Sequence, residues 1–331
     1  MKKRIRQIRK LKWGVAGCGS FTENTFIPTL LLLKRSVLTS IYSSNPARAE
    51  FIANKFSAAS SYNDYKEFLK QDFDVLYIGS ANYNHYWQVI EAAKAGKHIL
   101  CEKPLALTSE EAEKMVEVCE ANNVFLSVNY VHRFHPLSVK AKEIIKKDMI
   151  GTIVMVSASF NIDFKPNDNF RFDIKKSGGG ALRDLGTHMI DLLRFFGGEI
   201  TDVKGFIDNL VYKSEVDDFA TGLFKFKKGG YGFISVSFNS QNAFNRIEIT
   251  GSIGSLSIEN IIGRKKPIGK LVIDLPGEAR KAFRKRANKQ LYALRAIQKS
   301  LLHNIQPQVT GYDGFINMQL MEKLENKKDD L

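Results

Sequence analysis

The sequence has few of the residues that stabilise proteins lacking a large core. It holds 3 cysteines and 8 prolines among 331 residues. Because Cys18, Cys101 and Cys119 are few and widely spaced, they predict neither a disulfide framework nor a Cys-x-x-Cys metal site. No apolar run approaches the roughly 18 residues that a membrane span needs. We therefore expect no membrane association and a reducing, cytoplasmic compartment.

Acidic residues are also scarce. The chain has 49 Lys and Arg against 35 Asp and Glu, a formal net charge of +14. Such an excess favours an anionic partner: nucleic acid, a membrane surface or a phosphorylated small molecule. Basic residues gather in residues 1–10, which we expect to form a solvated arm, and in residues 264–290. No recognition motif or aromatic platform accompanies them, so we do not expect nucleic acid as a partner.

The rest of the composition is that of a globular protein, with 44% hydrophobic and 11% aromatic residues. At roughly 150 residues per domain, the length predicts two domains. Residues 11–128 alternate short apolar runs with helical patterns, which predicts βαβ units and a parallel sheet. Further on, strand-like segments alternate apolar and polar residues, typical of an antiparallel sheet with one covered face. Helices are expected there at 182–196 and 281–303. We place the domains at 1–128 and 129–331, in an α/β fold.

A glycine-rich turn follows the first predicted strand and opens a helix. Gly17 permits a tight turn, and Gly19 lets the backbone approach a pyrophosphate. Ser20 and Phe21 then begin the helix, whose N-terminal amides would receive the phosphates. Thr22 stands where the third glycine of a G-x-G-x-x-G pattern falls, so the helix and strand should pack slightly further apart. At the first strand of a βαβ chain, this turn predicts a Rossmann domain that binds a dinucleotide.

The end of the second predicted strand bears on the choice of cofactor. An acidic residue there would bind the adenosine ribose hydroxyls and repel a 2′-phosphate. This chain has Ser43 and Ser44 instead, followed by Arg48. These side chains favour NADP(H) over NAD(H). The alternative is that the two serines only cap the helix that starts at Pro46.

Further motifs follow in order along the chain. They are Gly79-Ser80-Ala81-Asn82 with His85, Glu102-Lys103-Pro104, Asn129-Tyr130 with His132-Arg133-Phe134, and Gly178-Gly179-Gly180 with Asp184 and His188. Together they resemble the Gfo/Idh/MocA oxidoreductases, the glucose–fructose oxidoreductase and inositol dehydrogenase family, over residues 11–260. A weaker match continues at 310–314. The chain departs from the family pattern at Thr22 and at 79–82, where a Thr-Pro pair often precedes the Asn.

The resemblance implies an N-terminal Rossmann parallel sheet and a C-terminal α/β domain with a large, mostly antiparallel open sheet. The C-terminal domain would bind substrate and pair subunits through the open face, as a homodimer or homotetramer. The resemblance also implies a cis bond before Pro104, which would aim Lys103 inward.

Roles for individual residues follow from the same resemblance. Lys103 matches the lysine of the Glu-Lys-Pro signature and would stabilise a developing alkoxide. Asp184 and His188 match an Asp-x-x-x-His pattern on one helix face. The histidine would exchange a proton, and the aspartate would bind a second hydroxyl or orient the histidine. Hydride transfer needs no metal, and no third ligand is spaced with this pair, so we expect none.

The remaining expected site residues fall into two sets. Those expected at the cofactor are Gly17, Gly19, Ser20, Phe21, Ser43, Ser44, Arg48, Ser80, Asn82, His85, Glu102 and Lys103. Those expected at the substrate are Lys103, Tyr130, Arg133, Asn161, Asp184 and His188. We expect Arg133 to brace the substrate side, and His132 and His135 to be structural.

These motifs indicate an NAD(P)-dependent oxidoreductase acting on CH-OH groups of a sugar, cyclic polyol or nucleotide sugar. The positive charge favours an anionic sugar, and a solvated basic surface is the other explanation for it. The alternative function is a dinucleotide-binding regulator or scaffold without turnover. That alternative predicts the loss of Lys103, Asp184 or His188, and all three are present.

Overall fold

The computed structural model describes residues 9–263 and 268–326. Most of the predicted basic arm, and residues 264–267 of the second basic segment, lie outside these ranges. The chain forms two compact units. Of the described residues, the first unit contains 9–105, 113–129 and 290–312, and the second contains 106–112, 130–263, 268–289 and 313–326. The chain therefore passes between the units several times, whereas the sequence pattern shows a single change near residue 129.

The first unit is built on a six-stranded sheet in the order β3-β2-β1-β4-β5-β6. Its strands are β1 (Leu11–Ala16), β2 (Ser36–Tyr42), β3 (Ser60–Tyr62), β4 (Val75–Ile78), β5 (His98–Cys101) and β6 (Leu126–Val128). Every pair is parallel, as predicted. The strand order reverses between β1 and β4, so a crevice for ligands is expected at the carboxyl ends of these two strands.

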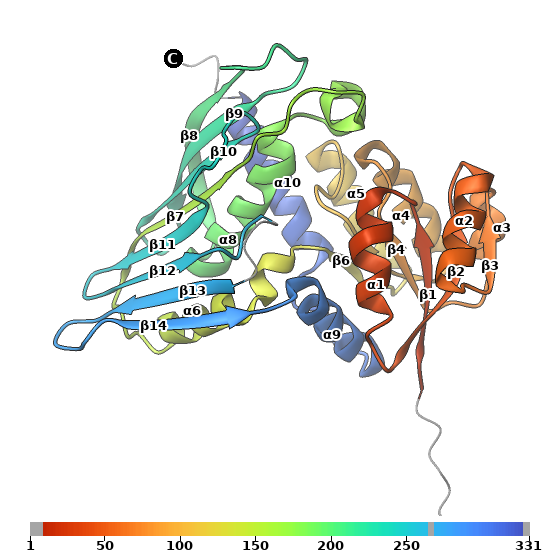
Figure 1. The fold of residues 1–331 in the computed structure, drawn as a ribbon, viewed down its shortest axis with the longest axis horizontal. Helices are drawn as coiled ribbons and strands as arrows, with labels where there is room; N and C mark the ends of the chain where they lie inside the picture. The colour runs from red at the N-terminus through yellow and green to blue at the C-terminus, as the bar shows by residue number, and fades with distance from the viewer. Residues whose placement is uncertain (1–8, 264–267, 327–331) are drawn as a thin grey trace, which may run out of the picture. The chain divides into compact units, whose positions relative to one another are not determined.

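Helices cover this sheet (Figure 1). They are α1 (Ile27–Leu30), α2 (Pro46–Phe56), α3 (Tyr65–Leu69), α4 (His85–Lys94), most of α5 (Ser109–Ala121) and nearly all of α9 (Lys289–Leu302), with the short 3-10 turn η2 (Asn82–Asn84). The helix predicted after the glycine turn contains a π-helical segment, η1 (Thr22–Phe26), before α1. In the core, the Phe26 ring stacks on Tyr77 at 3.4 Å between centroids. Leu294, Ile297 and Leu301 of α9 join this core, so a helix remote in sequence completes the first unit.

The second unit is built on an eight-stranded sheet in the order β14-β13-β12-β11-β7-β10-β9-β8. Its strands are β7 (Ile153–Asn161), β8 (Ile200–Asp208), β9 (Phe219–Phe226), β10 (Tyr231–Ser237), β11 (Arg246–Gly251), β12 (Ser255–Glu259), β13 (Ile268–Asp274) and β14 (Lys281–Arg286). Only β7 and β10 pair in parallel among the described strands of this sheet, which confirms a mostly antiparallel sheet.

One face of this sheet is covered by helices, and the other is open. The helices of the second unit are α6 (Pro136–Lys146), α7 (Ile174–Ser177), α8 (Thr187–Gly197) and most of α10 (Gly311–Asn326), with the turns η3 (Val131–Phe134), η4 (Phe170–Phe172) and η5 (Leu182–Gly186). Figure 1 shows α6 and α8 along the same face of the sheet. Phe206, Leu223 and Tyr231 are exposed on the open face, where the resemblance predicts subunit pairing.

The helix predicted at 281–303 is wrong over its first eight residues, because α9 begins only at Lys289. Lys281–Arg286 form β14, which pairs antiparallel with β13 across a turn at Pro276-Gly277. Gly277 adopts a φ of +73°, which glycine tolerates and which permits the tight reversal. The pairing of Phe283 with the buried Leu271 holds the strand against the sheet. The sequence analysis also did not predict β3, β13, α6 or α10.

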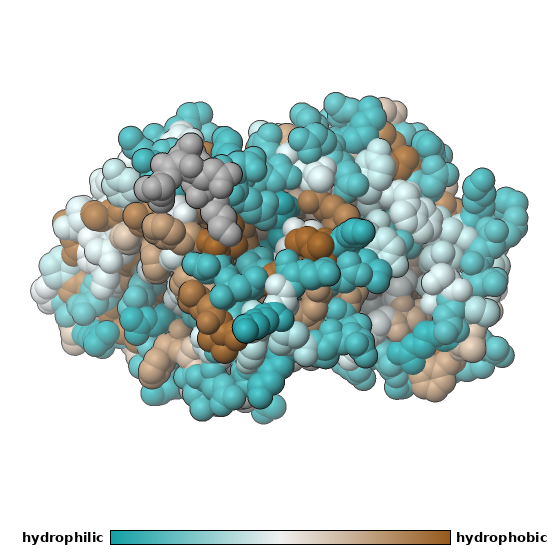
Figure 2. Space-filling model, turned by 90° about the horizontal axis from the view of Figure 1, so that it is seen from above, coloured by the Kyte–Doolittle hydropathy of each residue, from teal (hydrophilic) through white to brown (hydrophobic). Residues whose placement is uncertain are grey.

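No described helix is long and apolar enough to cross a membrane. On the face drawn in Figure 2, hydrophilic residues predominate and hydrophobic residues lie between them in separate groups.

His135 gives the second unit a testable dependence on pH. Its Nδ1 accepts a hydrogen bond of 3.2 Å from the Leu137 amide and so caps α6. Burial, with help from the nearby Lys289 charge, lowers the pKa of His135 to about 4. An unfolded histidine titrates near about 6.5, so the unfolded state binds the extra proton between these values. Stability is therefore lost as the pH falls from about 6.5 towards 4.

His135→Asn should reduce this loss, because asparagine also caps a helix but does not titrate. Urea unfolding at pH 7 and pH 5 should show the wild type losing about 2 kcal/mol more than the variant between the two pH values. His303→Asn, at an exposed histidine, is the control and should behave as the wild type. Equal losses in the wild type and His135→Asn would contradict this role for His135.

Candidate active site

The glycine turn after β1 has one position that is closed to a side chain and one that is open. Gly17 adopts a φ of +94°, and a Cβ there would lie 2.4 Å from the Ser80 amide nitrogen. A Cβ on Gly19 would meet no heavy atom within 4 Å. The helix begins at Ser20, so the open space above Gly19 lies beside unpaired helix amides. This space fits the pyrophosphate of a dinucleotide, as the sequence predicts.

Thr22, in the third position of the motif, is accommodated by a second glycine. A Cβ on Gly79, directly after β4, would lie 2.8 Å from the Thr22 hydroxyl oxygen. The missing side chain at Gly79 therefore makes room for the larger residue at Thr22. The loop after β4 thus leaves the volume that Thr22 fills.

The end of β2 is fixed mainly by Asn45 rather than by the two serines. The Asn45 side chain caps α2 by accepting from the Arg48 amide, and the Ser43 hydroxyl accepts from the Asn45 amide at 3.2 Å. Arg48 donates from Nε to the Cys18 carbonyl at 3.0 Å and pairs with Glu23. Lys55 pairs with the same carboxylate at 2.6 Å. Hydrogen bonds from Lys55 and Arg48 lower the pKa of Glu23, so two cations share one anion beside the glycine turn.

The Glu102-Lys103-Pro104 turn lies at the carboxyl end of β5. The Glu102 carboxylate accepts from the Tyr77 hydroxyl at 2.9 Å, from the Asn129 amide group at 2.6 Å and from the Lys103 backbone amide at 3.4 Å. Burial raises the pKa of Glu102, and these hydrogen bonds oppose that rise. The peptide bond between Lys103 and Pro104 is cis, as the resemblance implies. Glu102 therefore anchors the turn that carries Lys103.

His85, expected at the cofactor, lies beneath this turn. Its ring is fully buried, with Nδ1 3.0 Å from the Pro104 carbonyl oxygen and Nε2 3.1 Å from the Ser80 carbonyl oxygen. Burial lowers the pKa of His85. Both ring nitrogens thus contact the backbone, and the ring connects the loop after β4 to the turn after β5. Ser80 donates from its hydroxyl to Gln88 at 2.6 Å, and Asn82 is largely buried nearby in the chain.

In the second unit, the run Gly178-Gly179-Gly180 leads into the helix that carries Asp184 and His188. A Cβ on Gly180 would lie 1.9 Å from the Asp217 carbonyl oxygen, so only glycine fits there. The Asp217 carboxylate accepts from the Gly180 and Leu182 amides at 2.7 and 2.8 Å. Asp184 falls in the π-helical η5 and His188 in α8, so the predicted helix has a wider turn between them. Segments of π-helix recur at functional sites.

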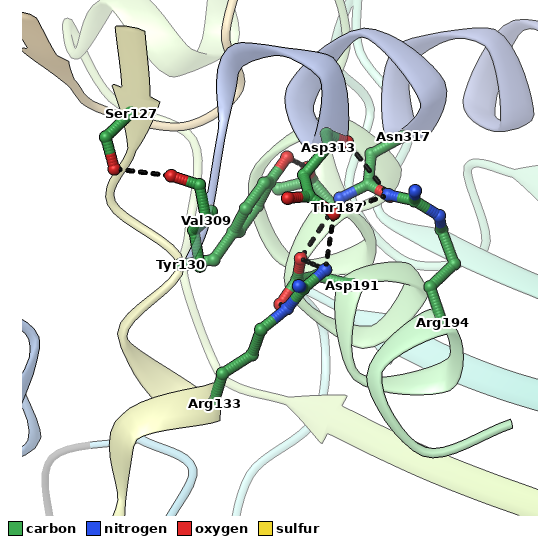
Figure 3. A network of polar contacts seen from close by, with 9 residues as sticks. All are labelled: Ser127, Tyr130, Arg133, Thr187, Asp191, Arg194, Val309, Asp313 and Asn317. Atoms are coloured by element: carbon green, nitrogen blue, oxygen red, sulfur yellow. Dashed lines mark hydrogen bonds and ion pairs between the residues drawn. The ribbon is translucent and has the colours of Figure 1, made fainter. Parts of the chain in front are cut away.

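Charged and aromatic groups surround these two side chains. Asp184 pairs with Nε of Arg171 at 3.3 Å. The ring of His188 is 9% exposed and lies 4.8 Å from the His132 ring, at an interplanar angle of 89°. The Tyr130 and Phe160 rings lie 6.1 and 6.3 Å away. Tyr130 shares a hydrogen bond of 2.7 Å with Thr187, the residue before His188 (Figure 3).

Arg133 braces α8 through buried ion pairs (Figure 3). Its guanidinium pairs with Asp191 at 2.6 Å and with Asp313 at 3.1 Å. Although burial opposes the charged form, the two carboxylates raise the pKa of Arg133. Arg194 donates to the Asp313 carbonyl and to Asn317, each at 3.0 Å. These contacts agree with a bracing role for Arg133 and explain the Asp313 of the 310–314 motif.

The structure gives one expected site residue other contacts than those predicted, and it brings two unassigned residues to the site. Asn161, expected at the substrate, ends β7, and its backbone amide and carbonyl are both bonded to the Asn245 side chain. The sequence analysis assigned no role to Arg171 or Lys289 and treated His132 as structural. Arg171 contacts Asp184 across 13 residues of chain, and Lys289 contacts His132 across 157, so neither pairing shows in a local pattern.

Comparison with known proteins identifies the class. A model of the oxidoreductase family with an NAD-binding Rossmann fold matches residues 11–130, and one of the GFO/IDH/MocA C-terminal domain matches residues 138–257. The chain belongs to the Gfo/Idh/MocA oxidoreductase family. It is 29% identical to levoglucosan dehydrogenase of Pseudarthrobacter phenanthrenivorans over 70% of this chain and 66% of that one, just under two thirds of that protein. It is 27% identical to 1,5-anhydro-D-fructose reductase of Ensifer adhaerens over 92% of both chains.

Solved structures share the fold. A levoglucosan dehydrogenase in complex with NADH and levoglucosan aligns with a TM-score of 0.89 at 22% identity, over 97% of this chain and 98% of that one. A 3-ketoreductase from Actinomadura kijaniata with NADP and TDP-benzene aligns with a TM-score of 0.84 at 23% identity, over 96% and 98%.

The two glycines of the turn predict a contrasting pair of variants. Gly19→Ala places a methyl group in open space, so the fold should keep its stability within about 0.5 kcal/mol. That methyl group would stand between the backbone and a pyrophosphate, so the Kd for reduced nicotinamide cofactor should rise about tenfold or more. Gly17→Ala should instead destabilise the protein by about 2 kcal/mol or more, through its φ and its close contact. Thermal unfolding and fluorescence titration measure both. Unchanged cofactor binding by Gly19→Ala would show that the phosphates bind elsewhere.

Proposed function

We propose that this protein transfers hydride between a nicotinamide cofactor and a hydroxyl-bearing carbon of a sugar, cyclic polyol or nucleotide sugar. The observation that carries the proposal is the hydrogen-bonded Glu102 carboxylate, which anchors the turn of Lys103 at the carboxyl edge of the dinucleotide-binding sheet. The relatives named above act on sugars by name. The cofactor, when bound, would supply or accept the hydride.

The chain's own residues would then handle the proton and the alkoxide. Lys103 carries an ammonium that stabilises a developing alkoxide at the reacting carbon. His188 suits proton exchange, because an ordinary histidine titrates near neutral pH and this one keeps 9% of its surface exposed. Asp184 would bind a second substrate hydroxyl. Its pairing with Arg171 favours the carboxylate form that accepts such a hydrogen bond.

The cofactor is proposed to be NADP(H) rather than NAD(H). No acidic residue lies directly after β2, where the chain has Ser43 and Ser44 instead. Arg48 and Lys55 give two positive charges against the single negative charge of Glu23. The local excess of positive charge favours a 2′-phosphate. The net charge of +14 is consistent with an anionic substrate such as a nucleotide sugar.

A panel of sugars, polyols and nucleotide sugars, followed by nicotinamide absorbance with both cofactors, tests the activity. With the best substrate, Lys103→Met should keep its Kd for cofactor but lose about 10²-fold or more in kcat.

His188→Asn should lower kcat/KM and remove one limb of the pH–rate profile between about pH 6 and 8. Asp184→Asn should mainly raise KM. Lys94→Met, at an exposed lysine of α4, is the matched control and should change none of these values. A near wild-type kcat in Lys103→Met would remove Lys103 from the mechanism.

Cofactor choice is tested by titrating NADPH and NADH separately. The wild type should bind NADPH more tightly, and Arg48→Met should weaken NADPH by about tenfold while changing NADH little, the size of one lost charge-assisted hydrogen bond. Ser43→Asp should shift the preference towards NADH, because a carboxylate repels the 2′-phosphate. NADH binding about tenfold tighter than NADPH in the wild type would overturn this preference.

A further inference from the structure

Lys289, the first residue of α9, contacts a histidine that no sequence motif assigns to the reaction. Its Nζ lies 2.8 Å from the Ile261 carbonyl oxygen and 3.3 Å from Nδ1 of His132. His132 is 3% exposed, and its ring meets the His188 ring edge to face at 4.8 Å. Lys289, His132 and His188 thus form a continuous row within the second unit.

We propose that Lys289 is a positioning residue for the proton-transfer histidine: it holds His132 in the neutral tautomer protonated at Nε2, and His132 in turn holds the ring of His188. The inference deepens the proposed function, since it rests on His188 exchanging the proton.

The chemistry of the two groups fixes the tautomer. An ammonium group has only donors, so Nδ1 of His132 must accept from Lys289. The single proton of a neutral His132 ring then lies on Nε2. Protonating Nδ1 as well would remove this acceptor and place a second positive charge beside the ammonium in a buried position. Lys289 therefore opposes protonation of His132.

The positive charge of Lys289 also opposes protonation of both histidine rings in the row. Two protonated rings 4.8 Å apart beside an ammonium would repel one another with little water between them. On the helix of His188, Asp184 lies on the preceding turn and pairs with Arg171, and Asp191 lies on the following turn and pairs with Arg133. Tyr130 and Phe160 contribute uncharged rings. Lys289 also helps to lower the pKa of His135, after the larger effect of burial.

The packing explains how a fixed His132 orients His188. The two rings are nearly perpendicular, at 89°, and Phe160 contacts both, at 6.3 Å from each centroid. Rotation of the His132 ring would lose its bond to Lys289 and change its perpendicular contact with the ring of His188. The row therefore restricts His188 through His132.

The test uses the full-length protein and the variants Lys289→Met and Lys289→Arg. The control is Lys142→Met, because Lys142 also donates to a backbone carbonyl of this unit, that of Phe196 at 3.3 Å. Nitrogen-15 NMR of the imidazole rings, with His132 assigned by His132→Asn, reports the tautomer without any need for activity. We expect the Nε2-protonated form in the wild type, in Lys289→Arg and in Lys142→Met, and a mixture of tautomers in Lys289→Met. An Nδ1-protonated His132 in the wild type, or an unchanged tautomer in Lys289→Met, would overturn the proposal.

Kinetics separate this proposal from the proposed function. The acid limb of the kcat/KM profile should move up by about half to one pH unit in Lys289→Met, because a positive charge is lost, and should return towards wild type in Lys289→Arg. The lysine control should leave the limb in place. If His188→Asn keeps the limb, the role of His188 fails while the tautomer result stands. If the limb depends on His188 but does not move in Lys289→Met, the positioning role of Lys289 fails alone.

Discussion

The half-buried carboxylate of Glu102 makes the interactions on which the first unit's candidate site depends. It accepts from Tyr77 of β4, from Asn129 directly after β6 and from the Lys103 amide of its own turn. Gln290, at the start of α9, exchanges hydrogen bonds with Asn129 at 3.1 and 3.2 Å and so extends the network. A buried carboxylate is costly unless it is hydrogen-bonded, so these donors are a requirement of the fold and not an addition to it. The hydrogen bonds to Glu102 therefore fix the position of the turn that carries Lys103.

In the second unit, other hydrogen-bonded and ion-paired carboxylates hold the helix that carries Asp184 and His188. Asp217 holds the start of the helix that carries Asp184, while the ion pairs of Arg133 with Asp191 and Asp313 hold α8 from its far side. Burial raises the pKa of Asp191, and the charge of Arg133 opposes that rise. Removing one member of such a pair leaves a buried charge without a partner, which is more costly than removing both. The groups proposed to carry the chemistry therefore stand on elements that hydrogen-bonded or ion-paired carboxylates hold in place.

Local signals were sufficient to predict much of the fold and to propose the most specific candidate site residues. The Gly17-Cys18-Gly19 turn, the Glu102-Lys103-Pro104 turn and the Asp184–His188 spacing are short patterns with fixed geometry, and they could be read directly. The parallel and antiparallel sheets followed from strand patterning. What could not be read depends on contacts between distant segments: α9 enters the core of the first unit, and Lys281–Arg286 become a strand because β13 pairs with them. Arg171 and Lys289 gain their places only when the chain has folded around Asp184 and His132.

The central claim is that hydride passes between the nicotinamide and a carbon of the sugar substrate, and isotope transfer tests it most directly. The protein would be incubated with a keto-sugar substrate from the panel and with reduced cofactor that carries deuterium at the transferring position of C4. The account predicts a product alcohol that is heavier by one deuterium on the reduced carbon, as measured by mass spectrometry. Product without deuterium, or cofactor that retains its label while substrate is consumed, would contradict it.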